Sequence, residues 1–150
     1  RNLEIREAIP SLYKKNPAFY EGMRLQDLAQ GIHELTVKHD LPNMMFHAFE
    51  NLPKMEMTPH EAFQRELKGE IEEVRIEDMQ DRVSANMILP YPPGVPLVMP
   101  GEVLTKDNRA VLDFLLMLCE IGEHFPGFET DIHGAYRQAD GTYTVKVIKQ

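Results

Sequence analysis

Five side chains that can bind cations or transfer protons lie within eleven residues near the C-terminal end of the chain. They surround a Pro-Gly turn and are Glu123, His124, Glu129, Asp131 and His133. Carboxylates and imidazoles hold cations, act as acids and bases, or close turns by hydrogen bonding to the backbone. Their spacing does not select a metal. From the residues alone, a functional group and a turn-stabilising group are both open interpretations.

Two other positions invite a catalytic interpretation and do not support one. His33 and His39 are six residues apart, whereas two histidines that bind zinc from one helix face are about four apart. We therefore expect this segment to be a solvated helix face. Cys119 lies in an apolar stretch with no neighbouring base, so we expect a buried structural thiol.

Composition narrows the class of protein. The chain has 150 residues, 43% of them hydrophobic, and a formal net charge of −8. This charge argues against nonspecific binding of nucleic acid and is compatible with attraction of cationic small molecules. No apolar run is long enough for a membrane span, and no signal or transit peptide is recognisable. A single cysteine excludes a disulfide within the chain, so we expect a cytoplasmic protein.

The segment Leu89–Gly101 combines chain-breaking residues with apolar ones. Its five prolines and two glycines are Pro90, Pro92, Pro93, Pro96, Pro100, Gly94 and Gly101. Each proline fixes its φ angle and removes a backbone donor, which excludes regular helix and disfavours an interior strand. A solvated linker would be more polar. We expect an ordered, partly buried loop with short edge strands, packed by Tyr91, Val95 and Leu97.

The first half of the chain, which must position these segments, is predicted to be helical. A short helix end over Leu3–Lys15 stops at Asn16-Pro17, which caps and starts a helix over Pro17–Lys38. A further helix is predicted over Asn43–Glu50. The clearest local signal is Thr58-Pro59-His60-Glu61, a capping box that begins a helix ending at Gly69.

Strands enter in the second half. Val74 and Ile76 alternate with charged residues and predict a half-buried strand. Thr105 caps a helix from Lys106 to about Glu123 that is apolar around nearly its whole circumference and should be buried. Asp140-Gly141 predicts the turn of a C-terminal hairpin. The fold class is therefore α+β: several helices packed on small mixed or antiparallel sheets, with an ordered proline-rich loop and a C-terminal hairpin.

The proline-rich loop resembles the signature of an enzyme family. Residues 87–102 resemble the PYPPG-x-P-x-x-x-PGE pattern in the C-terminal region of bacterial ornithine/lysine/arginine decarboxylases. The motif positions are Pro90, Tyr91, Pro92, Pro93, Gly94, Pro96, Pro100, Gly101 and Glu102. Residues 125–134 resemble a second signature of that region, and the likeness extends over essentially the whole chain. Residues 131–136 and the ending 143–147 look most like lysine decarboxylases.

The resemblance implies a parent enzyme of fold type I that uses pyridoxal phosphate (PLP) and converts L-lysine to cadaverine and carbon dioxide. The family's S-x-H-K cofactor motif is absent from this sequence. We therefore expect the chain alone to bind neither PLP nor metal and to be inactive. The start at Arg1 without an initiating Met hints at a fragment. Residues 1–150 are expected to be the C-terminal domain, with 1–16 as the end of a preceding helix or linker.

The resemblance also implies partners. In the family this domain packs beside the PLP-binding domain of the same chain, near the mouth of the active-site channel. The parents are dimers that often form decamers and consume protons during acid stress. In some lysine decarboxylases the C-terminal sheet docks a regulatory ATPase. Nucleic acid and membrane are not expected partners, and a free-standing binding or regulatory module with the same fold is the alternative.

Two expectations concern surfaces. Lysine carries a distal ammonium, so Glu129, Asp131 and His133 are the candidates for residues near the channel, against the alternative that they hold the turn together. Helix faces that carry apolar residues are expected to have packed on the neighbouring domain, so the excised chain should self-associate. These residues are Met23, Met44, Met45 and Phe49.

Overall fold

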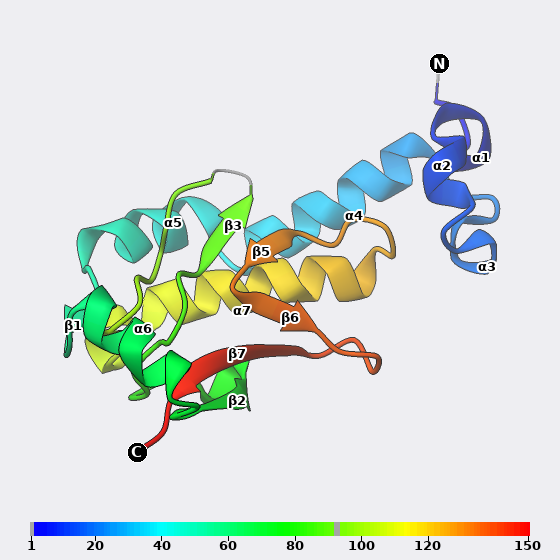
Figure 1. Ribbon diagram of the computed structural model, residues 1–150. Helices are drawn as coiled ribbons and strands as arrows, with labels where there is room; N and C mark the ends of the chain where they lie inside the picture. Colours follow the sequence, from blue (N-terminus) through cyan, green and yellow to red (C-terminus); the bar gives the residue numbers. More distant parts are fainter. Residues whose placement is uncertain (1, 92–93) are drawn as a thin grey trace.

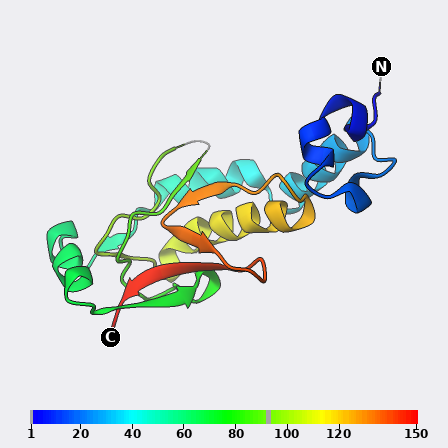
Figure 2. The same ribbon diagram turned by 45° about the vertical axis from the view of Figure 1, so that its right-hand side comes forward.

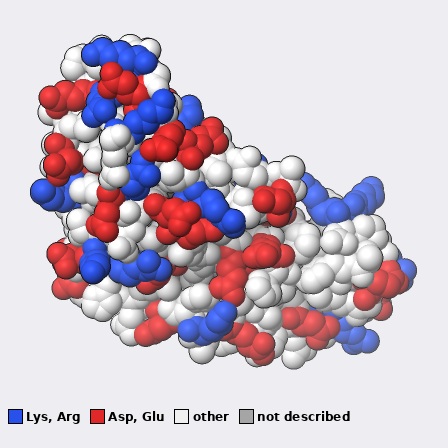
Figure 3. All heavy atoms as spheres, turned by 90° about the horizontal axis from the view of Figure 1, so that it is seen from below, with Lys and Arg blue, Asp and Glu red and all other residues white. Residues whose placement is uncertain are grey.

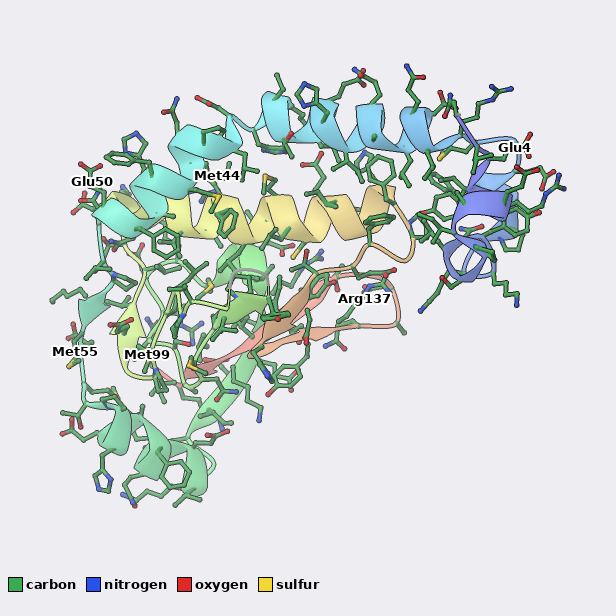
Figure 4. All side chains as sticks on the ribbon, turned by 90° about the horizontal axis from the view of Figure 1, so that it is seen from above. Glu4, Met44, Glu50, Met55, Met99 and Arg137 are labelled. Atoms are coloured by element: carbon green, nitrogen blue, oxygen red, sulfur yellow. The ribbon has the colours of Figure 1, made fainter. Side chains whose placement is uncertain are left out.

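The computed structural model describes residues 2–91 and 94–150 (Figure 1). Helix α7 (Arg109–His124) runs through the middle of the molecule. Helices α4 (Leu25–Lys38) and α5 (Leu41–Glu50) lie along one side of it, and the small sheets lie along the other, as the view from above shows (Figure 4). The α+β class predicted from the sequence is confirmed.

The central helix is buried as its composition predicts. Thr105 accepts a hydrogen bond from the backbone N–H of Asp107, and a short 3-10 helix, η2 (Lys106–Asn108), leads into α7. The side chains of α7 that are buried in the main core are Val111, Leu112, Phe114, Leu115, Met117 and Leu118. Helix α7 therefore acts as the shared support for both layers.

The described strands form three small antiparallel sheets. The largest has the order β2-β7-β6, from Ile71–Arg75, Tyr143–Ile148 and Ala135–Arg137. Strands β6 and β7 are the predicted C-terminal hairpin. The other sheets pair β1 (Lys54–Met55) with β4 (Glu102–Val103), and β3 (Leu89–Tyr91) with β5 (Asp131–His133).

The strand predicted around Val74 and Ile76 ends at Arg75, earlier than expected. Ile76 does not continue β2 but starts a 3-10 helix, η1 (Ile76–Asp78), and is almost completely buried. Helix α6 (Pro59–Leu67) begins as predicted, because Glu61 accepts from the backbone N–H of Thr58 at 2.8 Å and the Thr58 hydroxyl accepts from that of Glu61. Gly69 follows it with a positive φ of 72°.

The single helix predicted over Pro17–Lys38 is wrong. The structure has α3 (Pro17–Tyr20), a break, and then α4. Gly22 takes a φ of 73° in the break. The following residues run beside the start of the chain, where the N–H of Leu25 donates to the carbonyl of Leu3 at 3.0 Å. This long-range pairing interrupts the helix, and local propensity does not report it.

The helix predicted to start at Asn43 starts at Leu41 instead, because Asp40 turns the chain with a φ of 48° and Pro42 fits the first helical turn. At the other end of α4, helices α1 (Ile5–Ala8), α2 (Pro10–Tyr13) and α3 form a separate knob (Figures 1 and 2). Its own core contains Ile5, Leu12, Tyr20, Leu28, Leu35 and Phe125. Within the described residues, no helix is long and apolar enough to cross a membrane.

Candidate functional site

The proline-rich loop and the acidic/histidine turn meet in one two-stranded ribbon, β3–β5. The register pairs are Leu89 with His133, Pro90 with Ile132, and Tyr91 with Asp131. Opposed residues of an antiparallel pair point to the same side of the sheet, and neighbours alternate. Pro90 and Ile132 are accordingly buried, while Tyr91, Asp131 and His133 are exposed. The ribbon thus carries a phenol, a carboxylate and an imidazole on one open face.

The ribbon is held on the molecule by the base of the proline-rich loop. The N–H of Ile88 donates to the carbonyl of Val98 at 2.8 Å, and the N–H of Leu97 donates back to Ile88 at 2.9 Å. All three side chains are at most 5% exposed. The two arms of the loop rise side by side from the sheets (Figure 2).

The prediction of which side chains pack this loop is right for Leu97 and wrong for two others. Tyr91 is 66% exposed and Val95 is 44% exposed. The pairing register explains the error for Tyr91, because it places Pro90 and not Tyr91 on the inner face. Ile88 and Val98 supply the burial instead. The motif residues Pro92 and Pro93 lie outside the described residues.

Other motif residues fix the backbone of the loop. Gly101 has a φ of 88°, and a Cβ there would lie 2.2 Å from the carbonyl oxygen of Met57. The carboxylate of Glu102 accepts a hydrogen bond from the N–H of Met99 at 2.7 Å. Gly94 has a φ of 78°, and its N–H donates to the carbonyl of Pro90. These contacts give the signature a structural function that needs no ligand.

Glu129 is held in a different environment from Asp131 and His133. Its Oε1 lies 3.7 Å from a guanidinium nitrogen of Arg137 on β6. Its backbone packs on α7 so closely that a Cβ on Gly122 would lie 3.0 Å from the Cα of Glu129. Burial raises the pKa of Glu129, but backbone N–H groups, first that of Gly127, together with Arg137 outweigh it and leave the pKa below its usual range. Glu129 is therefore an ionised, partnered carboxylate.

The five candidate residues do not form one cluster. Asp131 and His133 lie on the exposed ribbon face, and neither side chain has a hydrogen bond or ion pair within the described part of the chain. His124 is bonded through Nδ1 to the carbonyl of Glu120 at 3.1 Å, and Glu123 is exposed at the end of α7. Across residues 2–91 and 94–150, no group of His, Cys, Asp and Glu has the arrangement of a metal site.

The turn that precedes β5 is attached to the N-terminal knob. The hydroxyl of Tyr20 donates to the carbonyl of Pro126 at 2.7 Å. Gly127 has a φ of 100°, and a Cβ there would lie 2.5 Å from a methyl carbon of Leu12. Residues 2–16 thus pack against the turn that leads into the ribbon.

Comparison with known families decides the class of this domain. The family model described as "Orn/Lys/Arg decarboxylase, C-terminal domain" matches residues 42–149. The chain belongs to this family. It is 65% identical over 149 residues to the inducible lysine decarboxylase of Escherichia coli K12, and 62% identical over 150 residues to the lysine decarboxylase of Hafnia alvei. Each alignment covers 99% of this chain but only 21% and 20% of the relative.

The fold agrees with that of solved members. The structure of the E. coli constitutive lysine decarboxylase superposes with a TM-score of 0.91 at 64% identity, over 99% of this chain and 21% of that one. The chain therefore spans about a fifth of the length of the relatives that it matches. It is a C-terminal domain of the lysine decarboxylase type.

The lysines of this decarboxylase domain do not fit a PLP site. A lysine that forms a Schiff base is usually desolvated in a pocket, which lowers its pKa. Here the lysines are exposed or half-exposed: Lys14, Lys15, Lys38, Lys54, Lys68, Lys106, Lys146 and Lys149. Lys38 and Lys146 form ion pairs with Glu120 and Glu66. No step through the cofactor can be assigned to these residues.

Sequence reasoning misses two members of the site region. Tyr91 is expected from the sequence to pack inward, yet it is the exposed register partner of Asp131. Arg137 is not singled out by any motif, yet it pairs with Glu129. A signal for Arg137 is available, because it stands in the strand before the predicted Asp140-Gly141 turn. None is available for the pairing of Tyr91 with Asp131, which are forty residues apart.

Proposed function

We propose that this chain is the noncatalytic C-terminal domain of a PLP-dependent lysine decarboxylase, which converts L-lysine to cadaverine and carbon dioxide. The observation that carries the proposal is the high identity over nearly the whole domain to lysine decarboxylases from two enterobacteria. In the parent, PLP supplies the electron sink for loss of the carboxylate. This chain contributes to the shape of the active-site entrance and to subunit contacts.

The proposed partners lie in the parent protein. They are the PLP-binding domain of the same chain, further copies in a dimer or decamer, and a regulatory ATPase, in the cytoplasm. Residues 1–16 are proposed as the entry from that preceding domain. The lysine inventory of the chain supports placing the Schiff-base lysine elsewhere.

The function is tested by comparing the full-length enzyme with the isolated chain. The full-length protein should release carbon dioxide from lysine in the presence of PLP. Purified residues 1–150 should release none and should show no saturable absorbance change on addition of PLP. A stoichiometric cofactor adduct on one lysine of the isolated chain would refute the assignment of the cofactor site to another domain.

We further propose that Asp131 and His133, with Glu129 nearby in the chain, lie close to the substrate channel. The exposed ribbon face supports this for Asp131 and His133, since a carboxylate with no partner among the described residues can attract the distal ammonium of lysine. For Glu129 the ion pair with Arg137 supports a structural role. The two roles can be separated by experiment.

In the full-length enzyme, Asp131→Asn should raise KM for lysine by about fivefold, since one charge at contact distance in water contributes roughly 1 kcal/mol. The effect should shrink at high salt, and the melting temperature should stay unchanged. Glu129→Gln should instead lower the melting temperature by a few degrees with KM unaltered. If Asp131→Asn leaves KM unchanged at low salt, the channel assignment is wrong.

A further inference from the structure

The proline-rich loop is a surface segment without charge. From Met87 to Gly101 the sequence contains no Asp, Glu, Lys or Arg, although these residues make up 27% of the chain. At that frequency, fifteen residues would carry about four charges. The loop nevertheless exposes apolar side chains on both arms: Met87 38%, Tyr91 66%, Val95 44% and Met99 38%. The face seen from below, in contrast, carries many acidic and basic side chains (Figure 3).

The exposed side chains stand on a fixed base. Ile88 and Val98 bond to one another and are fully buried, and β3 is paired with β5. The ring of Tyr91 covers the Gly94 turn, with a ring carbon 3.1 Å from the position of a Cβ on Gly94. The exposure of Tyr91 and Val95 is therefore a property of the fold and not of a loosely held tail.

This composition is typical of the centre of a protein interface. Interface cores are enriched in aromatic residues and Met and depleted in charged residues. Burying the loop would desolvate no charge from its own residues. On α5, in contrast, the exposed Phe49 is followed by Glu50, and on α6 the exposed Phe63 and Leu67 flank Arg65 and Glu66. Compared with the exposed apolar side chains of α5 and α6, the loop therefore has the lower cost of burial.

We infer that the exposed side of this loop, Met87, Tyr91, Val95 and Met99, docks against the part of the same polypeptide that precedes this domain in a full-length lysine decarboxylase. The inference rests on the proposed function. The matched relatives are about five times as long as this chain, and the region that matches is a C-terminal domain. In such a relative, about four fifths of the polypeptide therefore lies upstream of the matched region. A covalently tethered body reaches an effective concentration of about millimolar. The tethered part of the polypeptide therefore binds an apolar surface of this domain in preference to a second copy of the chain.

The test is thiol labelling of the full-length enzyme. Single cysteines are introduced as Val95→Cys on the loop, Phe46→Cys on α5, and Lys68→Cys as an exposed reference on the end of α6. Each variant is treated with a maleimide in the native state and in denaturant, and modification of the introduced cysteine is followed by peptide mass spectrometry. Native rates are divided by denatured rates to remove intrinsic differences in reactivity.

Labelling of the loop should be suppressed in the folded enzyme, so the Val95→Cys variant should react at least about tenfold more slowly than the Lys68→Cys variant. Equal rates would overturn the inference. Slow labelling that becomes fast on dilution to the monomer would also overturn it, because the cover would then be a second copy. Protection at Phe46→Cys but not at Val95→Cys would place the interface on α5 instead. The readout needs no activity, so loss of the proposed function and loss of this inference are separable.

Discussion

Two glycines of the signature segments stand where any side chain would collide with backbone. A Cβ on Gly134 would lie 2.1 Å from the carbonyl oxygen of Met87, and one on Gly101 would lie 2.2 Å from that of Met57. Backbone oxygens cannot move aside as the end of a flexible side chain can. The first contact joins the turn residue between β5 and β6 to the segment before β3, so the ribbon depends on the absence of one methyl group.

Gly134→Ala should therefore destabilise the domain by about 3 kcal/mol or more, since a strained φ and overpacking add. Gly141→Ala is the matched control: its φ is 86°, close to the 84° of Gly134, but nothing lies within 4 Å of its Cβ position. The control should cost only about 1–2 kcal/mol of conformational strain. Urea denaturation of both variants measures the difference. Equal losses would show that the close approach to Met87 is relieved cheaply.

The single cysteine, Cys119, is expected to react slowly in the folded chain. Burial, followed by the nearby carboxylate of Glu77, raises the pKa of the Cys119 thiol to about 12. At pH 8 the reaction of Cys119 with a disulfide reagent should be slower in the folded protein than in urea by about a hundredfold or more, because the thiolate is the reactive form. The structure makes Cys119 half-buried, where the sequence predicts a buried thiol. Comparable rates in the two states would contradict the raised pKa of the thiol.

The same shift has a consequence for alkaline stability. Because the folded pKa lies above the unfolded one, the folded state binds the proton more tightly. The contribution of Cys119 is complete below the unfolded pKa and is lost as the pH rises toward 12. Cys119→Ser should flatten this alkaline loss, which melting temperatures between pH 8 and pH 11 would detect.

At the scale of elements, the sequence predicts those helix ends that are fixed by contacts between neighbouring residues. The Thr58 capping box and the Asn16 cap are contacts between residues three apart, and both are present. The break at Gly22 and the pairing of β3 with β5 depend on residues more than fifteen positions away, so no window of sequence contains them. The orientation of Tyr91 depends on the same register, since one residue of shift reverses every side chain.

A charged contact joins the end of α4 to α7, and its contribution to the packing of the two helices can be tested. Lys38 Nζ lies 2.7 Å from one carboxylate oxygen of Glu120, and His39 Nε2 lies 2.5 Å from the other. The hydrogen bond from Lys38 lowers the pKa of Glu120 below its usual range against the opposing effect of burial, and His39 adds to it. The stabilisation is present above the unfolded pKa and is lost as the pH falls through the folded value.

Glu120→Gln should lower stability by about 1 kcal/mol at pH 7, the upper end for surface ion pairs, since Glu120 and His39 are partly buried while Lys38 is exposed. The variant should also lose less stability than the parent between about pH 5 and pH 3. Glu34→Gln on α4 is the control, because among the described residues the exposed carboxylate of Glu34 bonds to the neutral amide of Gln30 and to no cation. If both variants lose the same amount of stability as the pH falls, the contact of Glu120 with Lys38 and His39 contributes nothing.

At the scale of the whole molecule, α7 and the residue after it connect the two larger of three hydrophobic clusters. The main core lies between α5, α7 and the sheets, while Phe125 and the N-terminal helices form the second. The expectation that Met44 and Met45 lie on an open face is only partly met, because both pack against the main core and are half-buried. The open part of α5 is formed by Phe46, 64% exposed, and Phe49, 39% exposed.

The isolated chain should self-associate through such exposed apolar residues, since contiguous apolar surface on a monomer is usually covered. Phe46→Asp should weaken association in sedimentation velocity experiments, because a charge in an apolar contact must be desolvated. The side chain is largely exposed in the monomer, so the free energy of unfolding should change by about 0.5 kcal/mol or less. The melting temperature at low protein concentration should therefore change little. His60→Asp, at an exposed polar position on α6, controls for added charge. A wild-type chain that stays monomeric at high concentration would show that the apolar surface of α5 is tolerated in water and needs no partner.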